Sequence, residues 1–130
     1  MSHALPEDVI EKLGTFVPQQ ELKRVRVMTG VPWEWLPWLL RTGAVTVGDR
    51  VFFRKGRYGV DSARGLALIA HEALHTGQYR ELGRAGFLLR YLRGLAQCRF
   101  KHDAHPMEAE LVALQRRVRQ ALREAGLPDR

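Results

Sequence analysis

Hydrophobic residues recur at helical spacing through the second half of the chain. From Asp61 or Ser62, either of which can cap a helix, to Gly83, one apolar stripe predicts an amphipathic helix. The stretch RAGFLLRYLRGLAQCR then predicts a second helix, and a last one is predicted from Pro106 to about Ala125. The inner stripe of the first helix contains Leu68, His71, His75, Gln78 and Leu82, and that of the last contains Met107, Leu111, Leu114, Val118 and Leu122.

In the first half of the chain, the hydrophobic pattern predicts shorter elements. Residues 6–14 predict a short helix, and the basic and apolar alternation in ELKRVRVMTG predicts a half-buried strand that Gly30 ends. Two β-rich runs on either side of Gly48 and Asp49 predict a hairpin over residues 44–54. The segment VPWEWLPWLLRTG is expected to form a helix bent at Pro37.

These elements predict an α+β fold. A small antiparallel sheet or hairpin packs against the helix that carries the histidines, with one or two further helices around it. With 130 residues, of which 45% are hydrophobic, we expect one domain over residues 1–130.

Cysteine content and targeting signals exclude some classes of protein. Cys98 is the only cysteine, which excludes an intramolecular disulfide and a cysteine-based zinc site. The N-terminus does not read as a signal peptide, and no stretch is apolar for long enough to span a bilayer. We therefore expect a cytoplasmic protein, unless a dedicated system exports it.

Residues His71, Glu72 and His75 form the pattern H-E-x-x-H within the predicted inner helix. Residues four apart lie on one helical face, so both imidazoles can reach one ion, whereas the glutamate is turned about 100° away. That glutamate can instead act as a general base on a water molecule activated by the metal. Zinc suits neutral imidazole ligands. The alternative without a metal ion is a partly buried, hydrogen-bonded histidine pair.

A catalytic zinc ion needs a third protein ligand. The extended pattern with a later glycine and a third histidine is excluded, because Gln78 and Glu81 stand at those positions. The segment HPMEAEL offers Glu108 and Glu110, which flank the inner stripe of the last helix at similar angles, so periodicity leaves both open. As other candidate ligands, His102, His105 and Cys98 are weaker.

The net charge of +7, with a pI near 10.3, and the three tryptophans allow other interpretations. A basic surface attracts nucleic acid, acidic substrates or anionic membranes, although the arginines are spread along the chain. The tryptophans at positions 33, 35 and 38 could form a membrane or partner surface. Burial in the core is favoured, because large aromatic residues usually supply packing area in a small domain.

Residues from about 22 to 115 resemble small bacterial zinc-metallopeptidase-like domains, minimal relatives of the thermolysin-like gluzincins. Such domains are often found in polymorphic toxins and in proteins associated with contractile injection systems. The resemblance rests on VTVGDRVFFRKGRY, LALIAHEALHTGQYRELGRAGFLLRYL and HPMEAE. It implies that Glu108 is the third ligand, although Leu111 and Val112 replace the alanine and aspartate common in this family. It also implies that RVFFR, the second strand of the hairpin, forms a cleft rim that pairs with an extended peptide.

The sequence thus predicts a zinc-dependent peptidase that acts on a peptide or protein substrate and has partners in a secretion or toxin system. His71, His75 and Glu108 would hold Zn²⁺, Glu72 would be the catalytic base, and His105 or Tyr79 could stabilise the oxyanion. One alternative is a catalytically silent zinc domain that acts as a binding or assembly module. Another is a basic nucleic-acid-binding protein with structural zinc.

Overall fold

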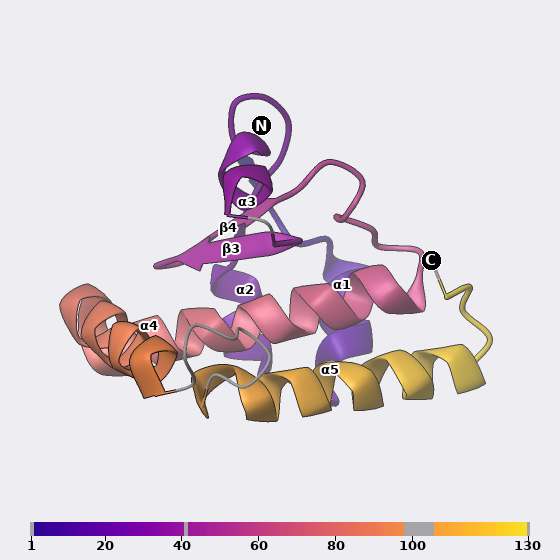
Figure 1. Cartoon of the computed structure of the whole chain (residues 1–130). Coiled ribbons are helices and arrows are strands. Elements are labelled where there is room, and N and C mark those ends of the chain that lie inside the picture. The colour runs from indigo at the N-terminus through magenta and orange to yellow at the C-terminus, as the bar shows by residue number, and fades with distance from the viewer. Residues whose placement is uncertain (1, 41, 98–105, 130) are drawn as a thin grey trace.

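The structure is a computed structural model that describes residues 2–40, 42–97 and 106–129. It has the α+β fold that the sequence predicts, with a small sheet and helices around it (Figure 1). The elements are β1 (Ser2–Ala4), α1 (Glu7–Leu13), α2 (Gln19–Arg24), β2 (Arg26–Met28), α3 (Trp35–Leu39), β3 (Ala44–Val47), β4 (Arg50–Phe53), α4 (Ala63–Gln97) and α5 (Pro106–Glu124).

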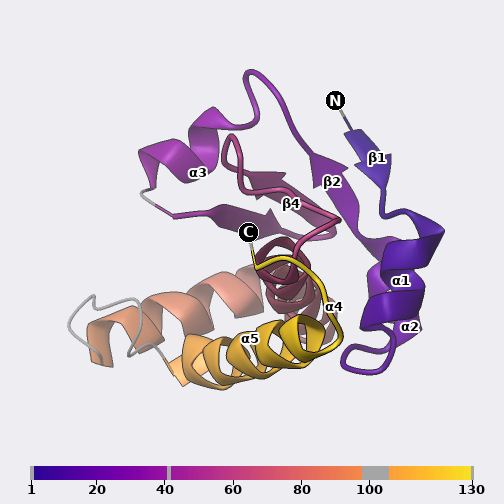
Figure 2. The same cartoon turned by 90° about the vertical axis from the view of Figure 1, so that its right-hand side faces the viewer.

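Helix α4 is the centre of the architecture. It lies between the sheet and α5, while α1 and α2 cover a further side (Figures 1 and 2). Because α4 is covered on several sides, its core positions are mostly small or aliphatic. The buried core contains Val9, Leu13, Leu22, Val51, Phe53, Leu66, Ala67, Ile69, Ala70, Ala73 and Val118.

The sheet has four strands in the order β1-β2-β4-β3. The predicted hairpin is confirmed: β3 and β4 are antiparallel, and Gly48 in the turn has a φ of 64°. Strands β2 and β4 are parallel, however, so the sheet is mixed and not purely antiparallel. Because β4 pairs on both sides, the expectation that RVFFR forms an exposed strand edge is wrong. The outer strand beside it is β3.

The strand predicted in ELKRVRVMTG is correct only in part. Its first residues belong to α2, which starts after Pro18, and the strand itself spans Arg26–Met28. Leu22 and Val25 are both buried, and their spacing of three residues is that of a helical turn and not of a strand. The burial of Leu22 and Val25 therefore decides the conformation here, against the strand that the alternation of basic and apolar residues predicts.

Helix α4 starts at a well-defined cap and contains one break. The Ser62 hydroxyl oxygen accepts a hydrogen bond from the Gly65 amide at 3.0 Å, as the sequence predicts for a cap. The amides of Ala63 and Arg64 donate to the carbonyls of Pro128 and Asp129. At Gly83 the backbone has φ 74° and ψ 165°, so two helices meet there, in agreement with the predicted boundary.

The expectation that the tryptophans lie in the core is wrong. Trp33, Trp35 and Trp38 are 39%, 57% and 60% exposed. Helix α3 is a single short turn that lies across the sheet from α4 and α5, so few partners are available to cover its side chains (Figure 1). In the part of the chain that the structure describes, no helix has the length and apolar character needed to cross a membrane.

Candidate metal centre

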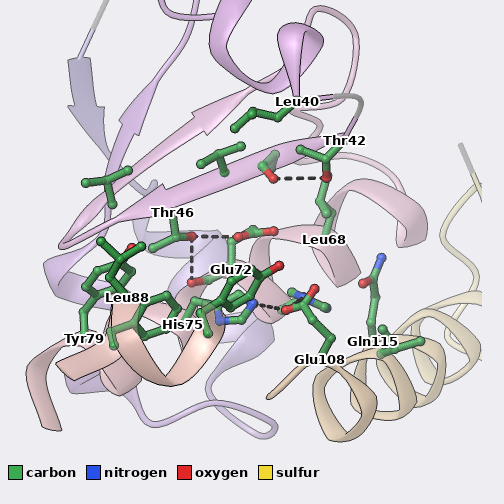
Figure 3. A pocket seen from close by; sticks show the side chains of 17 residues that line it. Leu40, Thr42, Thr46, Leu68, Glu72, His75, Tyr79, Leu88, Glu108 and Gln115 are labelled. Carbon is green, nitrogen blue, oxygen red and sulfur yellow. Dashed lines mark hydrogen bonds and ion pairs between the residues drawn. The ribbon is translucent and has the colours of Figure 1, made fainter. Parts of the chain in front are cut away.

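His71 and His75 lie one turn apart on α4 and point to the same side of the helix. Both side chains are buried, and their ring centroids are 5.1 Å apart. Each Nε2 atom faces Glu108, a residue of the first turn of α5, and Figure 3 shows this contact for His75. The spacing that the sequence shows within one helix therefore produces a pair of imidazoles aimed at a second helix.

Glu108 reaches the histidines because α4 and α5 pack side by side with opposite directions (Figure 1). The residue is 4% exposed, its Oε1 atom is 3.5 Å from Nε2 of His71, and the same oxygen contacts Nε2 of His75. Glu110 is exposed instead. Of the two carboxylates that periodicity left open, the structure thus brings Glu108 to the histidines and leaves Glu110 in solvent.

The remaining ring nitrogens determine which atoms can bind a cation. Nδ1 of His75 lies 2.8 Å from Oε1 of Gln78, an acceptor, so Nδ1 donates and Nε2 is left to bind either a proton or a metal ion. Such a contact to the other ring nitrogen is typical of metal-ligating histidines. Nδ1 of His71 is buried and has no hydrogen-bond partner within residues 2–40, 42–97 and 106–129. The sequence marked Gln78 as an inner residue but indicated no role for it.

The surroundings of His75 favour positive charge. Burial alone would lower the pKa of this imidazole, but the contact with Glu108, the charges of Glu72 and Glu108 and the Gln78 hydrogen bond together raise it. A lone pair of Nε2 and a carboxylate oxygen repel each other unless a proton or a metal ion lies between them. Either a proton on Nε2 or a metal ion therefore accounts for this contact.

The three side chains together form a donor set of the kind that binds metal ions. One ligand atom from each of His71, His75 and Glu108 can be chosen so that all three lie within 4.8 Å of one another. Imidazole nitrogens and a carboxylate oxygen are common ligands of divalent transition-metal ions. This cluster could therefore hold a metal ion.

Glu72 does not belong to the ligand cluster. Its Oε2 accepts a hydrogen bond of 2.7 Å from the hydroxyl of Thr46, on strand β3 (Figure 3). Glu72 is nevertheless buried and lines the same cavity as the three ligands. Thr46 is not among the residues that the sequence singles out, although its place on a predicted strand of the sheet that packs on the histidine helix was a usable signal.

The cavity has a volume of about 510 Å³ and lies between β3, α4 and the start of α5. Its walls are largely apolar and aromatic, including Leu40, Leu68, Phe87 and Leu88. Tyr79, a candidate for the oxyanion stabiliser, lines the cavity and stacks on Phe87 with 3.8 Å between ring centroids. Pockets of this volume accommodate small ligands or a few residues of a peptide. His105, His102 and Cys98 lie outside the described residues.

More than half of the chain matches a known protein family. The model of the eCIS core domain, where eCIS denotes an extracellular contractile injection system, matches residues 4–83. This chain belongs to the eCIS core domain family. The match includes His71, Glu72 and His75 but ends before Glu108. Membership associates the protein with contractile injection systems, as the resemblance implied.

No curated protein and no solved structure matches the chain. The family match supports the binding or assembly interpretation more directly than it supports peptide hydrolysis.

Proposed function

We propose that this chain is a zinc-binding module that serves the assembly or cargo of a contractile injection system. The observation that carries the proposal is the buried convergence of His71, His75 and Glu108 at the contact between α4 and α5. A carboxylate is seldom fully buried unless a cation compensates its charge. Membership in the eCIS core domain family supports the association with an injection system.

The choice of zinc rests on the ligands. Imidazole suits zinc, copper, iron and nickel, whereas calcium and magnesium prefer sites made of oxygen alone. Two imidazoles with one carboxylate are typical of zinc. Because the ligands come from both α4 and α5, an ion here would hold the two helices together, and its binding free energy would add to that of folding.

Metal content per chain tests this proposal. We expect about one zinc ion per wild-type chain after purification without chelator, and strongly reduced occupancy in His75→Ala and in Glu108→Ala. Glu110→Ala is the matched control, because the same substitution two residues away removes an exposed carboxylate. Equal zinc content in all four proteins would refute the site.

Peptide-bond hydrolysis is a second candidate function, and the position of Glu72 in the ligand-lined cavity favours it. A zinc ion at the cluster would supply Lewis-acid activation of a water molecule. Glu72 would accept the proton from that water and pass it to the leaving amine. Thr46 holds Oε2 of Glu72, which directs the carboxylate and leaves its other oxygen for proton transfer.

The substitution Glu72→Gln separates the two candidates. It keeps the size of the side chain and leaves all three ligands in place, so we expect unchanged zinc content. If the site is hydrolytic, wild-type protein degrades fluorescein-labelled casein or cleaves itself, and Glu72→Gln does neither. If neither protein cleaves and both retain zinc, hydrolysis of casein and of the chain itself is excluded and the binding module is the function that the data support.

A further inference from the structure

Residues 31–40 present an unusual amount of apolar surface. Six of their large side chains are between 39% and 69% exposed, and we call this group the tryptophan tip: Val31, Trp33, Trp35, Trp38, Leu39 and Leu40. Single exposed apolar residues are common, whereas a contiguous group marks an interaction surface. The metal centre does not account for the tip, since only Leu40 of this group lines its cavity.

Few contacts attach the tip to the rest of the protein. Pro37 is the buried residue of α3, and the Trp33 ring packs on Phe52 with 5.7 Å between centroids. From these contacts α3 projects on the side of the sheet opposite to α5, and both views show it at the periphery (Figures 1 and 2). The exposed side chains therefore form a projection that can meet a flat surface.

Positive charge accompanies the aromatic residues. Trp35 and Trp38 line a hollow of about 270 Å³ together with Arg54 and Lys55, which follow strand β4, and with Glu34. Among the residues that the structure describes, neither Arg54 nor Lys55 forms an ion pair. The chain as a whole carries a net charge of +7. A surface bound at the tip would therefore meet indole rings and available cations at the same place.

We propose that the tryptophan tip, with Arg54 and Lys55, docks this protein on a lipid surface rich in anionic phospholipids. Indole rings prefer the headgroup region of a bilayer, where an apolar ring and a polar N–H are both accommodated. Lysine and arginine next to that region are attracted by anionic headgroups. Stable binding of a peripheral protein generally needs two such signals, and the tip combines them. This inference is independent of the zinc site.

The positions of the tryptophans make the test specific. The chain has three tryptophans and all belong to the tip, so tryptophan emission excited selectively at the red edge of the absorption band reports on this surface alone. We expect the emission to shift to shorter wavelength with vesicles of equimolar phosphatidylcholine and phosphatidylglycerol. A much smaller shift is expected with phosphatidylcholine alone. Added salt should weaken binding to the anionic vesicles.

Co-sedimentation with the same vesicles measures the contribution of each group. We expect binding to fall at least tenfold for the double variant Trp35→Ala/Trp38→Ala. Each of Arg54→Gln and Lys55→Gln should lower it about fivefold, the usual effect of one cation near an anionic membrane. Leu89→Ala and Lys23→Gln are matched controls, because they remove an exposed apolar residue and an exposed cation elsewhere.

Two outcomes would overturn the proposal. One is the absence of any emission shift or sedimentation with anionic vesicles, which would leave the tip to a protein partner. The other is equal loss of binding in the tip variants and in the controls, which would show diffuse attraction by the net charge. Far-ultraviolet circular dichroism of each variant establishes that it is folded.

Discussion

The metal centre and the tryptophan tip differ in how the fold treats their side chains. His71, His75 and Glu108 are between 4% and 5% exposed, whereas Trp35 and Trp38 are 57% and 60% exposed. The first group is polar and enclosed, and the second is largely apolar and open. Each inverts the usual distribution of residues, in which polar groups face water and aromatic rings are buried. Such inversions mark the places where a chain has been shaped for something other than stability.

The two regions also depend on the fold to different degrees. The candidate metal centre requires α4, α5 and strand β3 to keep their relative positions, because its candidate ligands and the Glu72–Thr46 pair come from all three. The tip is contained in one short segment and rests on β3 and β4. Perturbations of the body should therefore affect the centre strongly and the tip weakly.

Removal of the metal should have the largest effect. If zinc links α4 to α5, a free concentration a thousandfold above its dissociation constant stabilises the protein by about 4 kcal/mol. Chelation should lower the free energy of unfolding by that amount, measured by urea titration of the wild type. Glu108→Ala should no longer respond to chelator, while Glu110→Ala should respond as the wild type does. A wild type insensitive to chelator contradicts the link between the helices.

Gly65→Ala should lower the free energy of unfolding by about 3 kcal/mol, which is at the upper end of the usual effect of overpacking. A Cβ atom at residue 65 would lie 2.3 Å from the carbonyl oxygen of Gly59, a backbone atom that cannot easily move. The start of α4 would shift, so we expect loss of stability together with reduced zinc content, measured by thermal unfolding and metal analysis.

Gly86→Ala is the matched control for that substitution. Its added Cβ would meet Leu82 at 3.6 Å, an ordinary contact. Because alanine is the better helix former, this change should leave the thermal midpoint unchanged or raise it. A similar loss of stability in both variants would mean that the close approach at Gly59 is not the cause.

Gln78→Leu should have a smaller effect, which is limited to the affinity for the metal ion. The substitution removes the acceptor for Nδ1 of His75, and loss of such a partner usually lowers metal affinity about 10–100-fold. Competition with a colorimetric zinc chelator measures the change. Gln78→Glu keeps an acceptor oxygen and should retain more of the affinity than Gln78→Leu does.

Trp35→Ala should change stability least, by less than about 0.5 kcal/mol, because the side chain is mostly in solvent. Trp33→Ala should cost more, since that ring packs on Phe52. Urea unfolding followed by circular dichroism measures both. Equal and large losses would show that the tip is a structural part of the core and would remove the contrast with the metal centre.

The same contrast explains what the sequence could predict. The spacing of His71 and His75 is a local property of one helix, so their shared orientation followed from helical geometry. The choice between Glu108 and Glu110 depends on how α5 docks against α4, which periodicity within α5 does not contain. The parallel pairing of β2 with β4 is likewise a contact between segments distant in the chain.

Exposure of the tryptophans was not predictable from composition. Aromatic residues are buried when enough neighbours surround them, and α3 is too short and too peripheral to gather these neighbours. Thr46 was hidden for a related reason, because a threonine in a strand ordinarily needs no explanation. Its contact with Glu72 becomes visible only once β3 is placed along α4.

The segment after α5 caps the start of α4, and this second attachment affects how the α4–α5 pair opens and closes at the candidate metal centre. The amides of Ala63 and Arg64 donate to Pro128 and Asp129, and further along the same helix the histidines meet Glu108. Two antiparallel helices fastened at separate points open as one unit, so the ligands should detach in a single cooperative event. Amide hydrogens at both points should then exchange with solvent at matched rates, each limited by the same opening.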